Sequence, residues 1–233
     1  MSRRIAAFIR HADYKQLAST PSALQPFALN QAGMEQAAQC AVQLKKIVSQ
    51  NNWRLNADID SSSLLRAWQT AKIASDLNHE LFETPPQINC FDELAERSVG
   101  SAANLTTQQI EQIIEVDPRF ESLPDKWKSD SHFKLPLMGA ESLLDAGERV
   151  AKHLTKQMSG LAESNDVQVK LFFGHGAAFR HAAYKLGILE FEKIAQLSMY
   201  HASPIYLEYL PDGSWQHIAG MWKVRAQHSE YTD

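Results

Sequence analysis

Two short apolar segments, each followed by a histidine, constrain the fold of this chain more than any other feature. Residues 4–10 form a nearly all-apolar run that leads into His11, and residues 167–174 form a second run that leads into His175. A short apolar run that ends abruptly in polar residues is typical of a buried strand whose carboxyl end reaches a polar site. Ligands bind beyond the carboxyl ends of strands in parallel sheets. Both histidines are therefore candidate site residues.

Helical patterns alternate with these strands. The clearest is a stripe of apolar residues at steps of three and four, formed by Met34, Ala37, Ala41, Leu44 and Val48. Further helices are expected over about 64–77, 107–116, 141–158 and 176–186. One of the serines at 61–63 is expected to cap the helix at 64–77, which places Arg66 in its first turn.

The order of the elements predicts the fold class. Residues 205–210 and 215–219 flank the sequence Pro-Asp-Gly-Ser, which indicates a terminal hairpin. Alternating strands and helices point to a parallel sheet that is covered on both faces. We therefore expect an α/β fold, a three-layer α/β/α sandwich with a mostly parallel central sheet, to which the hairpin adds antiparallel strands.

Length and composition exclude several classes of protein. The chain has 233 residues and a formal net charge of −4, because 23 Lys and Arg face 27 Asp and Glu. Single α/β domains commonly reach about 250 residues, so one domain over residues 1–233 is expected. The charge balance does not favour nucleic acid as a partner. No apolar stretch approaches the ~20 residues that cross a bilayer, so no membrane is expected either.

The same data predict a cytoplasmic location. The N-terminal sequence lacks the apolar segment of about 7–15 residues and the cleavage site of a secretory signal. Two cysteines, Cys40 and Cys90, are too few for a disulfide framework and fit reduced thiols. The oligomeric state is left open by the sequence.

Residues 117–139 form a long irregular segment. This stretch holds three prolines and mixed charges without helical or strand periodicity. Loops of this length inside compact domains are often functional, as lids over sites are. We expect a lid-like insertion here, in which Trp127 and Phe133 pack rather than stack on a substrate.

The two histidines admit three interpretations besides phosphate chemistry. Either one alone would more often be a hydrogen-bonded structural residue. A zinc or iron site normally adds a third nearby donor, and neither segment supplies a spaced His or Cys, so no metal and no cofactor are expected. A serine hydrolase of the elbow type would need Gly-x-Ser-x-Gly, which does not occur in this sequence.

Five motifs in order resemble a known family. They are Arg10-His11-Ala12, residues 63–71 (SLLRAWQTA), residues 94–100 (LAERSVG), Glu141-Ser142-Leu143 and Gly174-His175-Gly176. Together they resemble the histidine phosphatase superfamily, in its phosphoglycerate-mutase-like branch, over about residues 4–180. The resemblance implies a phosphoglycerate-mutase-like fold and a small phosphorylated molecule as the substrate.

The resemblance implies a pocket for one phosphoryl group. His11 would be the nucleophile, attacking phosphorus through one neutral ring nitrogen while a backbone carbonyl holds the other N–H. Arg10 and Arg66 would bind the phosphoryl oxygens, because guanidinium donors match their spacing. His175, if protonated, would add a cationic donor. The start of the helix that follows would add backbone N–H groups, from Gly176 and Ala177.

The motif around residue 96 implies a proton donor. Glu96 would act first as general acid and then as base, with Glu93 as the rival candidate. Arg97 either binds substrate or is a surface charge paired with Glu93. Arg66 could be an ordinary exposed helix residue, and Arg180 is expected to face solvent. No role is assigned to three other histidines, His181, His201 and His217.

The residues favour hydrolysis over transfer between hydroxyls. Ala12 stands where the family usually has glycine, which is tolerable unless φ is positive there. A mutase of this family would have an adjacent pair of arginines in the irregular segment and a tyrosine where this chain has Val99. We therefore expect a metal-independent phosphomonoester hydrolase. A phosphoglycerate mutase is the first alternative, and a non-catalytic phospholigand-binding module is the second.

Overall fold

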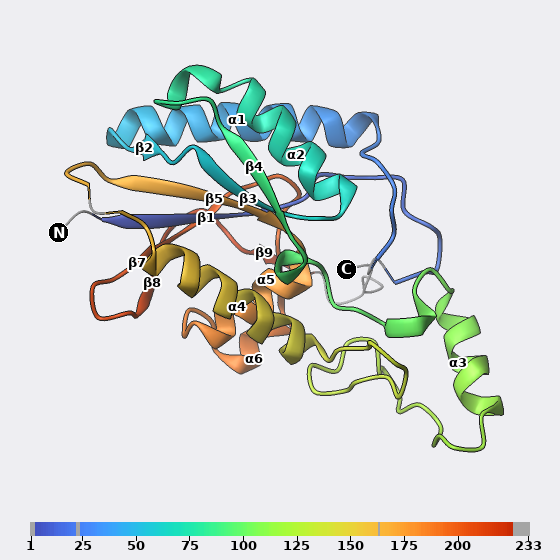
Figure 1. The fold of residues 1–233 in the computed structure, drawn as a ribbon. Helices are drawn as coiled ribbons and strands as arrows, with labels where there is room; N and C mark the ends of the chain where they lie inside the picture. The colour runs from blue at the N-terminus through green and yellow to red at the C-terminus, as the bar shows by residue number, and fades with distance from the viewer. Residues whose placement is uncertain (1–2, 22–23, 163, 226–233) are drawn as a thin grey trace.

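A seven-stranded sheet forms the centre of the molecule (Figure 1). The computed structural model describes residues 3–21, 24–162 and 164–225. Six strands follow one another in the order β4-β3-β5-β1-β7-β8, and β2 pairs with β5 at the side. The seven strands are β1 (Arg4–Arg10), β2 (Arg54–Leu55), β3 (Asp58–Ser62), β4 (Gln87–Phe91), β5 (Gln168–Gly174), β7 (Ile205–Tyr209) and β8 (Trp215–Ala219). A separate two-stranded sheet pairs β6 (Leu197–Ser198) with β9 (Lys223–Val224).

The pairing within the sheet brings the two predicted strands side by side. β1 and β5 are parallel neighbours, and Arg10 pairs with Gly174 at their carboxyl ends. β3 runs parallel to both β4 and β5. β7 runs antiparallel to β1, and β8 runs antiparallel to β7. The hairpin and both strands are confirmed, except that β5 starts one residue later than predicted. β4 was not predicted from the sequence.

Helices cover both faces of the sheet, as Figure 1 shows. On one side lie α1 (Gln31–Asn51) and α2 (Leu65–Asp76), and on the other lie α4 (Leu143–Ser159), α5 (Gly176–Lys185) and α6 (Phe191–Ile194). α3 (Thr107–Val116) lies beyond the carboxyl ends of the strands. Three short 3-10 helices complete the set: η1 (His79–Leu81), η2 (Asp92–Leu94) and η3 (Gly100–Ala102). The three-layer α/β/α prediction is confirmed.

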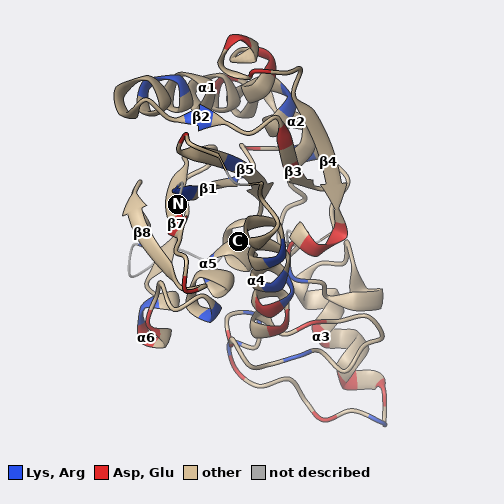
Figure 2. Cartoon of the chain, turned by 60° about the vertical axis from the view of Figure 1, so that its left-hand side comes forward, with Lys and Arg blue, Asp and Glu red and all other residues tan. Residues whose placement is uncertain are grey.

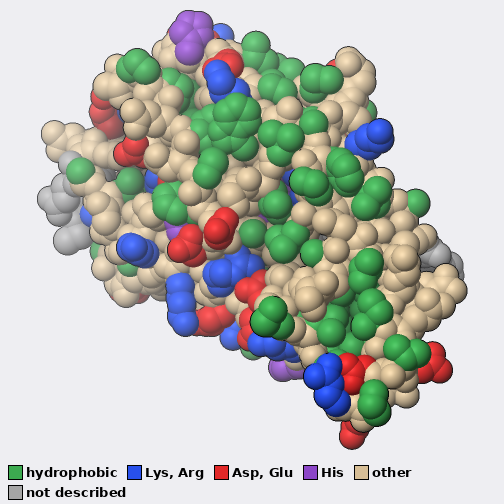
Figure 3. All heavy atoms as spheres, turned by 45° about the vertical axis from the view of Figure 1, so that its right-hand side comes forward, with side chains coloured by type: hydrophobic (Ala, Val, Ile, Leu, Met, Phe, Trp, Pro, Cys, Tyr) green, Lys and Arg blue, Asp and Glu red, His purple; other side chains and the backbone are tan. Residues whose placement is uncertain are grey.

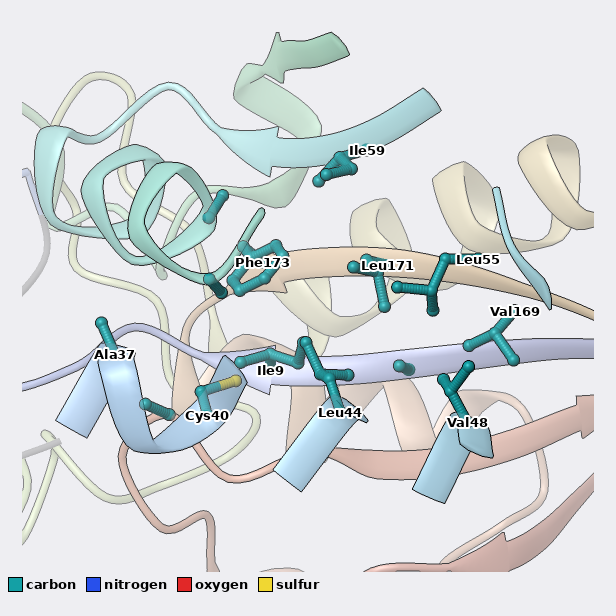
Figure 4. Packing of buried hydrophobic residues seen from close by; sticks show 14 of the residues in the cluster. Ile9, Ala37, Cys40, Leu44, Val48, Leu55, Ile59, Val169, Leu171 and Phe173 are labelled. Atoms are coloured by element: carbon teal, nitrogen blue, oxygen red, sulfur yellow. The ribbon is translucent and has the colours of Figure 1, made fainter. Parts of the chain in front are cut away.

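Alternation along β1 and β5 builds one apolar core on each face. Ile5, Ala7 and Ile9 pack toward α1 and α2, whereas Ala6 and Phe8 pack toward α4 and α5. Figure 4 shows the first core, in which side chains of α1 lie against the strands. Strands that are buried on both faces read as continuous apolar runs, which is why the two segments are recognisable in the sequence.

The helix pattern of α1 deviates from the prediction at its start. Met34 is exposed, while Gly33 and Cys40 are buried against the sheet side. A Cβ atom at Gly33 would lie 1.8 Å from the carbonyl oxygen of Asp13. Only glycine allows α1 to approach the loop after β1 this closely. Cys40 and Cys90 are free thiols, the former buried and the latter exposed.

The predicted serine cap of α2 is wrong. The residue at the N-cap position is Leu64, and its side chain makes no capping hydrogen bond. The serines before it continue β3 instead, and Ser61 and Ser62 are both fully buried. Arg66 does lie in the first turn, as predicted, but it is fully buried rather than exposed.

Residues 117–139 contain no helix or strand and pack on a small apolar cluster of their own. The cluster joins this segment to α3 and to the chain before it, through Val99, Ala102, Ile110, Trp127, Leu135 and Ala140. The indole N–H of Trp127 donates to Glu111 of α3, at 3.2 Å. Trp127 is 3% exposed, so the expectation that it packs is confirmed.

Charged residues of both signs are mixed over the surface. Figure 2 shows Lys, Arg, Asp and Glu side by side along α4, and they also intermingle on the face drawn in Figure 3. Within residues 3–225, apart from 22–23 and 163, no helix is long and apolar enough to span a bilayer. Over the same residues no cluster of three or more His, Cys, Asp or Glu could hold a metal ion.

One buried ion cluster ties the sheet to α4. Asp60 of β3 accepts from Lys170 of β5 at 2.7 Å and lies 2.8 Å from Nε2 of His153 in α4. Lys170 also donates to the carbonyl oxygen of Asp58, at 2.7 Å. All three charged or titratable side chains are less than 5% exposed. Because each polar group has a partner, this cluster holds three elements in register.

Candidate active site

The residues of the predicted pocket meet at the carboxyl ends of the parallel strands. Arg10 and His11 close β1, and His175 follows β5 directly. Arg66 comes from the first turn of α2, which follows β3, and Glu96 lies just beyond η2, which follows β4. The parallel register therefore brings to one edge of the sheet five side chains from four separate parts of the sequence.

His11 has the state that a nucleophile requires. Its Nδ1 lies 2.8 Å from the carbonyl oxygen of Ala12, which can only accept, so Nδ1 carries the proton and Nε2 keeps its lone pair. The pKa of His11 is well below its usual value, because the ring is buried and Arg66, His175 and Arg10 oppose a positive charge. The predicted hydrogen bond to a backbone carbonyl is thereby confirmed. The ring is neutral at neutral pH.

Ala12 is compatible with the turn that follows His11. Its φ is not among the positive values of the described chain, so the methyl group causes no backbone strain. Its N–H donates to Oγ1 of Thr70 at 3.0 Å, and this hydroxyl donates to the carbonyl oxygen of Arg66 at 2.7 Å. This hydroxyl links the loop of His11 to the first turn of α2.

Arg66 is held rigidly in the site. Its guanidinium donates to the carbonyl oxygen of Gln25 at 2.7 Å and lies 3.2 Å from Nδ1 of His175. It also lies over the ring of Tyr14, with Cζ 4.6 Å from the ring centroid. The interpretation of Arg66 as an exposed helix residue is wrong.

His175 was expected to add a cationic donor only if it is protonated, and its contacts correspond to a neutral ring. Arginine can only donate, so Nδ1 of His175 accepts from Arg66, and Nε2–H donates to Oγ of Ser62 at 2.9 Å. Burial, Arg66 and Arg10 keep its pKa well below the usual value. The ring of His175 lies 5.0 Å from that of His11, centroid to centroid. His175 is therefore a neutral partner of the arginines.

Arg10 lies beside Gly176, the first residue of α5. One of its guanidinium nitrogens donates to the carbonyl oxygen of Met199 at 3.0 Å. A Cβ atom at Gly176 would lie 3.2 Å from Cδ and Nε of Arg10. Glycine at this position leaves room for the arginine. Gly176 therefore contributes to the shape of the pocket, because the absence of a side chain at this position makes room for Arg10.

Glu96 occupies the N-terminus of α5. Its carboxylate accepts from the N–H groups of Ala177 and Ala178, at 3.2 and 3.0 Å, and from the N–H of Arg97, at 2.9 Å. A helix N-terminus is a favourable place for a carboxylate. The amide of Ala177, expected to bind phosphate, thus donates to the carboxylate here. Glu96 is 5% exposed, whereas Glu93 is exposed, and this geometry favours Glu96.

A second arginine fixes the segment that carries Glu96. Arg149 of α4 donates to both carboxylate oxygens of Glu141, at 2.8 and 2.7 Å. Its Nη1 also lies 2.8 to 3.2 Å from three backbone carbonyl oxygens within residues 92–95. Glu141 in turn accepts from the N–H of Ser98 at 3.1 Å. The Glu141 motif therefore positions Glu96 and does not face the phosphate pocket.

Three neighbours of the pocket were not recognised from the sequence. Ser62 binds His175, and Tyr14 lies edge-on to His11 with ring centroids 5.3 Å apart. The ring of His201 lies 5.7 Å from that of His11. Burial and the charge of Arg10 lower the pKa of His201 to about 3. Isolated Ser, Tyr and His residues form no spaced motif, so no sequence signal marks them.

A cavity of about 90 Å³ opens beside Glu96. Lys128, Ser129 and Ser131 of the irregular segment line it, together with Arg97 and residues of α5 and α6. Arg97 and Arg180 are 6% and 4% exposed, so the interpretations of a surface charge at Arg97 and of a solvent-facing Arg180 are both wrong. Both side chains line the cavity together with residues 128, 129 and 131.

We expect stability to fall on mild acidification, because four imidazoles are held neutral. The pKa values of His11 and His175 lie well below 6.5, and burial and neighbouring arginines lower those of His181 and His201 to about 3. Below about pH 6.5 the unfolded chain therefore binds more protons than the native state. Each imidazole should remove about 1.4 kcal/mol of unfolding free energy per pH unit in this range.

Urea unfolding at pH 7, 6 and 5 in phosphate-free buffer measures this slope. His201→Asn should reduce it by the share of one imidazole, whereas His217→Asn, at an exposed position of β8, should not change it. An unfolding free energy that is constant from pH 7 to pH 5 would contradict the neutral assignment.

The chain belongs to the histidine phosphatase superfamily, branch 1, whose sequence profile it matches over residues 7–219. The pocket at the carboxyl ends of the strands is built from residues of the family motifs. Among proteins of curated function, none matches the sequence significantly.

Solved structures share the fold over nearly the whole chain. YhfR of Bacillus stearothermophilus is 19% identical with a TM-score of 0.71, and the superposition covers 93% of this chain and 96% of that one. A mycobacterial glucosyl-3-phosphoglycerate phosphatase is 20% identical with a TM-score of 0.64, at 96% and 98% coverage. A putative alpha-ribazole-5'-P phosphatase from Escherichia coli K-12 is 16% identical with a TM-score of 0.64, at 95% of each chain.

Proposed function

We propose that this chain is a phosphomonoester hydrolase that forms a phosphohistidine on His11, with Glu96 as the general acid and base. The observation that carries the proposal is the neutral state of His11, whose Nδ1–H is held by a carbonyl while Nε2 keeps its lone pair. A buried imidazole of this kind, close to two guanidinium groups, is suited to attack phosphorus.

Arg10 and Arg66 would stabilise the charge of the phosphoryl group in flight. This group spreads negative charge over three equatorial oxygens, and positioned cations lower the energy of that state. Both arginines act on the same imidazoles, since each lowers the pKa of His11 and of His175. The geometry supports this role, because Arg66 lies 3.2 Å from Nδ1 of His175 and Arg10 lies beside Gly176.

The reaction would proceed in two balanced steps. In the first, Nε2 of His11 forms a bond to phosphorus, the bond to the ester oxygen breaks, and Glu96 gives its proton to the departing oxygen. In the second, Glu96 takes a proton from water, the hydroxide forms a bond to phosphorus, and the P–N bond breaks. Inorganic phosphate and a free His11 result. The cavity beside Glu96 is large enough for water, because one molecule occupies about 30 Å³.

Two details outside the pocket support hydrolysis over a mutase. Val99 is buried in the small apolar cluster, so it supplies packing where a mutase would have a tyrosine hydroxyl. Arg119, in the irregular segment, pairs with its own neighbour Asp117 at 2.6 Å. One observation favours the mutase alternative: Arg97, Arg180 and Arg225, which lie outside the irregular segment, line the cavity beside Glu96.

Turnover of p-nitrophenyl phosphate tests the proposal directly. We expect the purified protein to release phosphate from this ester, with inhibition by vanadate, which mimics five-coordinate phosphorus. Incubation with 3-phosphoglycerate, with and without a bisphosphate primer, tests the mutase alternative. Appearance of 2-phosphoglycerate faster than free phosphate would overturn hydrolysis as the main activity. Binding of phosphate esters without any turnover would instead support the non-catalytic module.

A further inference from the structure

The hydroxyl group of Tyr14 is buried beside His11 without a hydrogen-bond partner among the residues that the structure describes. The residue is 5% exposed, and its phenolic oxygen is closed off from solvent. Buried hydroxyl groups in native proteins are almost always hydrogen-bonded, because an unpaired one has lost its contacts with water and gained nothing in exchange. An exception beside a candidate active site therefore requires an explanation.

The ring of Tyr14 is held against two residues of the pocket. It lies edge-on to the ring of His11, with centroids 5.3 Å apart, and Cζ of Arg66 lies 4.6 Å from its own centroid. The backbone of this residue is fixed as well. Its N–H donates to the side chain of Asp13 at 3.0 Å, and its carbonyl oxygen accepts from the N–H of Gln16 at 2.8 Å. The protein therefore sets the position of the hydroxyl before any ligand binds.

The charged groups around the hydroxyl belong to the pocket. Burial raises the pKa of Tyr14 above its usual value, so the phenol keeps its proton at neutral pH. The charges of Arg66 and Arg10 oppose this shift, and the charge of Glu96 adds to it. The same phenol acts in turn on the pKa of both arginines. The hydroxyl is therefore a hydrogen-bond donor that lies among the groups of the proposed reaction.

A second tyrosine provides a comparison. Tyr206 of β7 is 3% exposed, and its hydroxyl also lacks a partner among the described residues. Its ring packs in the core next to α1, with its centroid 5.7 Å from that of Trp53. Burial and the thiol of Cys40 in α1 raise its pKa. Tyr206 thus faces the apolar core, whereas Tyr14 faces the residues around His11.

We propose that Tyr14 is a further catalytic residue, whose hydroxyl donates a hydrogen bond to an oxygen of the phosphoryl group at His11. The inference rests on the proposed function, to which it adds a neutral donor besides the two arginines. The phosphoryl group in flight carries negative charge on three equatorial oxygens. A donor that is already fixed in a buried pocket stabilises this charge without a cost of reorganisation. No proton is transferred, so Tyr14 keeps its hydroxyl throughout.

Replacing Tyr14 with phenylalanine tests this role. Tyr14→Phe removes the hydroxyl and keeps the ring against His11 and Arg66. We expect kcat for p-nitrophenyl phosphate to fall by about 10- to 100-fold with a smaller change in KM, because the hydrogen bond is strongest in the transition state. The inhibition constant of vanadate, which mimics that state, should rise by a similar factor.

Tyr206→Phe is the matched control, because it removes a hydroxyl that is equally buried but faces the core. Its kcat, KM and vanadate inhibition should equal those of the wild type. In phosphate-free buffer neither variant should lower the urea midpoint, because each removes a hydroxyl that leaves no partner behind. Inorganic phosphate should raise the midpoint of Tyr14→Phe less than that of the wild type or the control. A lower midpoint of Tyr14→Phe in phosphate-free buffer would indicate a structural partner and overturn the proposal.

The outcomes separate the role of Tyr14 from the proposed function. Turnover of p-nitrophenyl phosphate with unchanged kcat, KM and vanadate inhibition in Tyr14→Phe would overturn this role and leave the hydrolase standing. If the wild type turns over no ester, the hydrolase fails, and calorimetric binding of inorganic phosphate decides the contact. Binding to Tyr14→Phe about tenfold weaker than to the wild type would then support it. Equal affinities, or no binding of phosphate to any of the three proteins, would refute it.

Discussion

Replacing His11 with alanine should lower phosphate release from p-nitrophenyl phosphate by a factor on the order of 10⁴ or more, because the covalent step loses its nucleophile. The expectation follows from the single free ring nitrogen of His11, whose other nitrogen is bound to the carbonyl of Ala12. Initial rates at saturating ester, measured with a phosphate assay that detects 10⁻⁵ of wild-type activity, provide the test.

Two controls make this result interpretable. His217→Ala removes an imidazole from an exposed position on β8 and should retain wild-type activity. Circular dichroism and the urea midpoint report whether the His11 variant is folded. More than a tenth of wild-type activity in a folded His11→Ala protein would falsify the assignment of the nucleophile.

Replacing Glu96 with glutamine should affect substrates unequally. With an alkyl ester such as glycerol 3-phosphate, whose alkoxide needs a proton to leave, we expect kcat to fall by about 10²–10⁴-fold. With p-nitrophenyl phosphate, whose leaving group is already stable as an anion, the loss in the first step should be much smaller. A glutamine oxygen can still accept the N–H groups of Ala178 and Arg97, but its NH2 group cannot accept the N–H of Ala177, so circular dichroism must show that the variant is folded.

The comparison with Glu93→Gln separates the two candidates for the proton donor. Glu93 is exposed, and this variant should behave as the wild type with both esters. Equal losses with the two esters in Glu96→Gln would remove Glu96 from the role of general acid. A leaving-group-dependent loss in Glu93→Gln instead would transfer that role to Glu93.

The sequence predicted the central elements of the fold because their patterns are local. β1 and β5 are buried on both faces and are therefore continuous apolar runs, and α3 has the predicted bounds. β4 was missed because this edge strand, with the sequence QINCF, is only five residues long, and so short an alternation of polar and apolar residues is a weak signal. The serines before α2 were misread because cap preference does not distinguish a helix start from the end of a buried strand.

The sequence predicts the site residues that belong to motifs. It does not predict the properties of the site that depend on contacts between distant parts of the chain. His11, Arg10, Arg66 and Glu96 meet as the motifs implied. The protonation state of His175 was not predictable, because it depends on Arg66 as a donor and on Ser62 as an acceptor, both brought in by other strands. Burial of Arg180 likewise requires the cavity, which sequence spacing cannot reveal.

The small apolar cluster beneath residues 117–139 makes this segment a separately packed part of the fold. That segment is anchored to α3 and to the chain before it, rather than to the two cores that hold His11 and His175 in place. Insertions or deletions there would leave the sheet undisturbed. Because Lys128 of the same segment lines the cavity beside Glu96, exchange of this one segment between relatives would change the wall of that cavity while the residues around His11 stay unchanged.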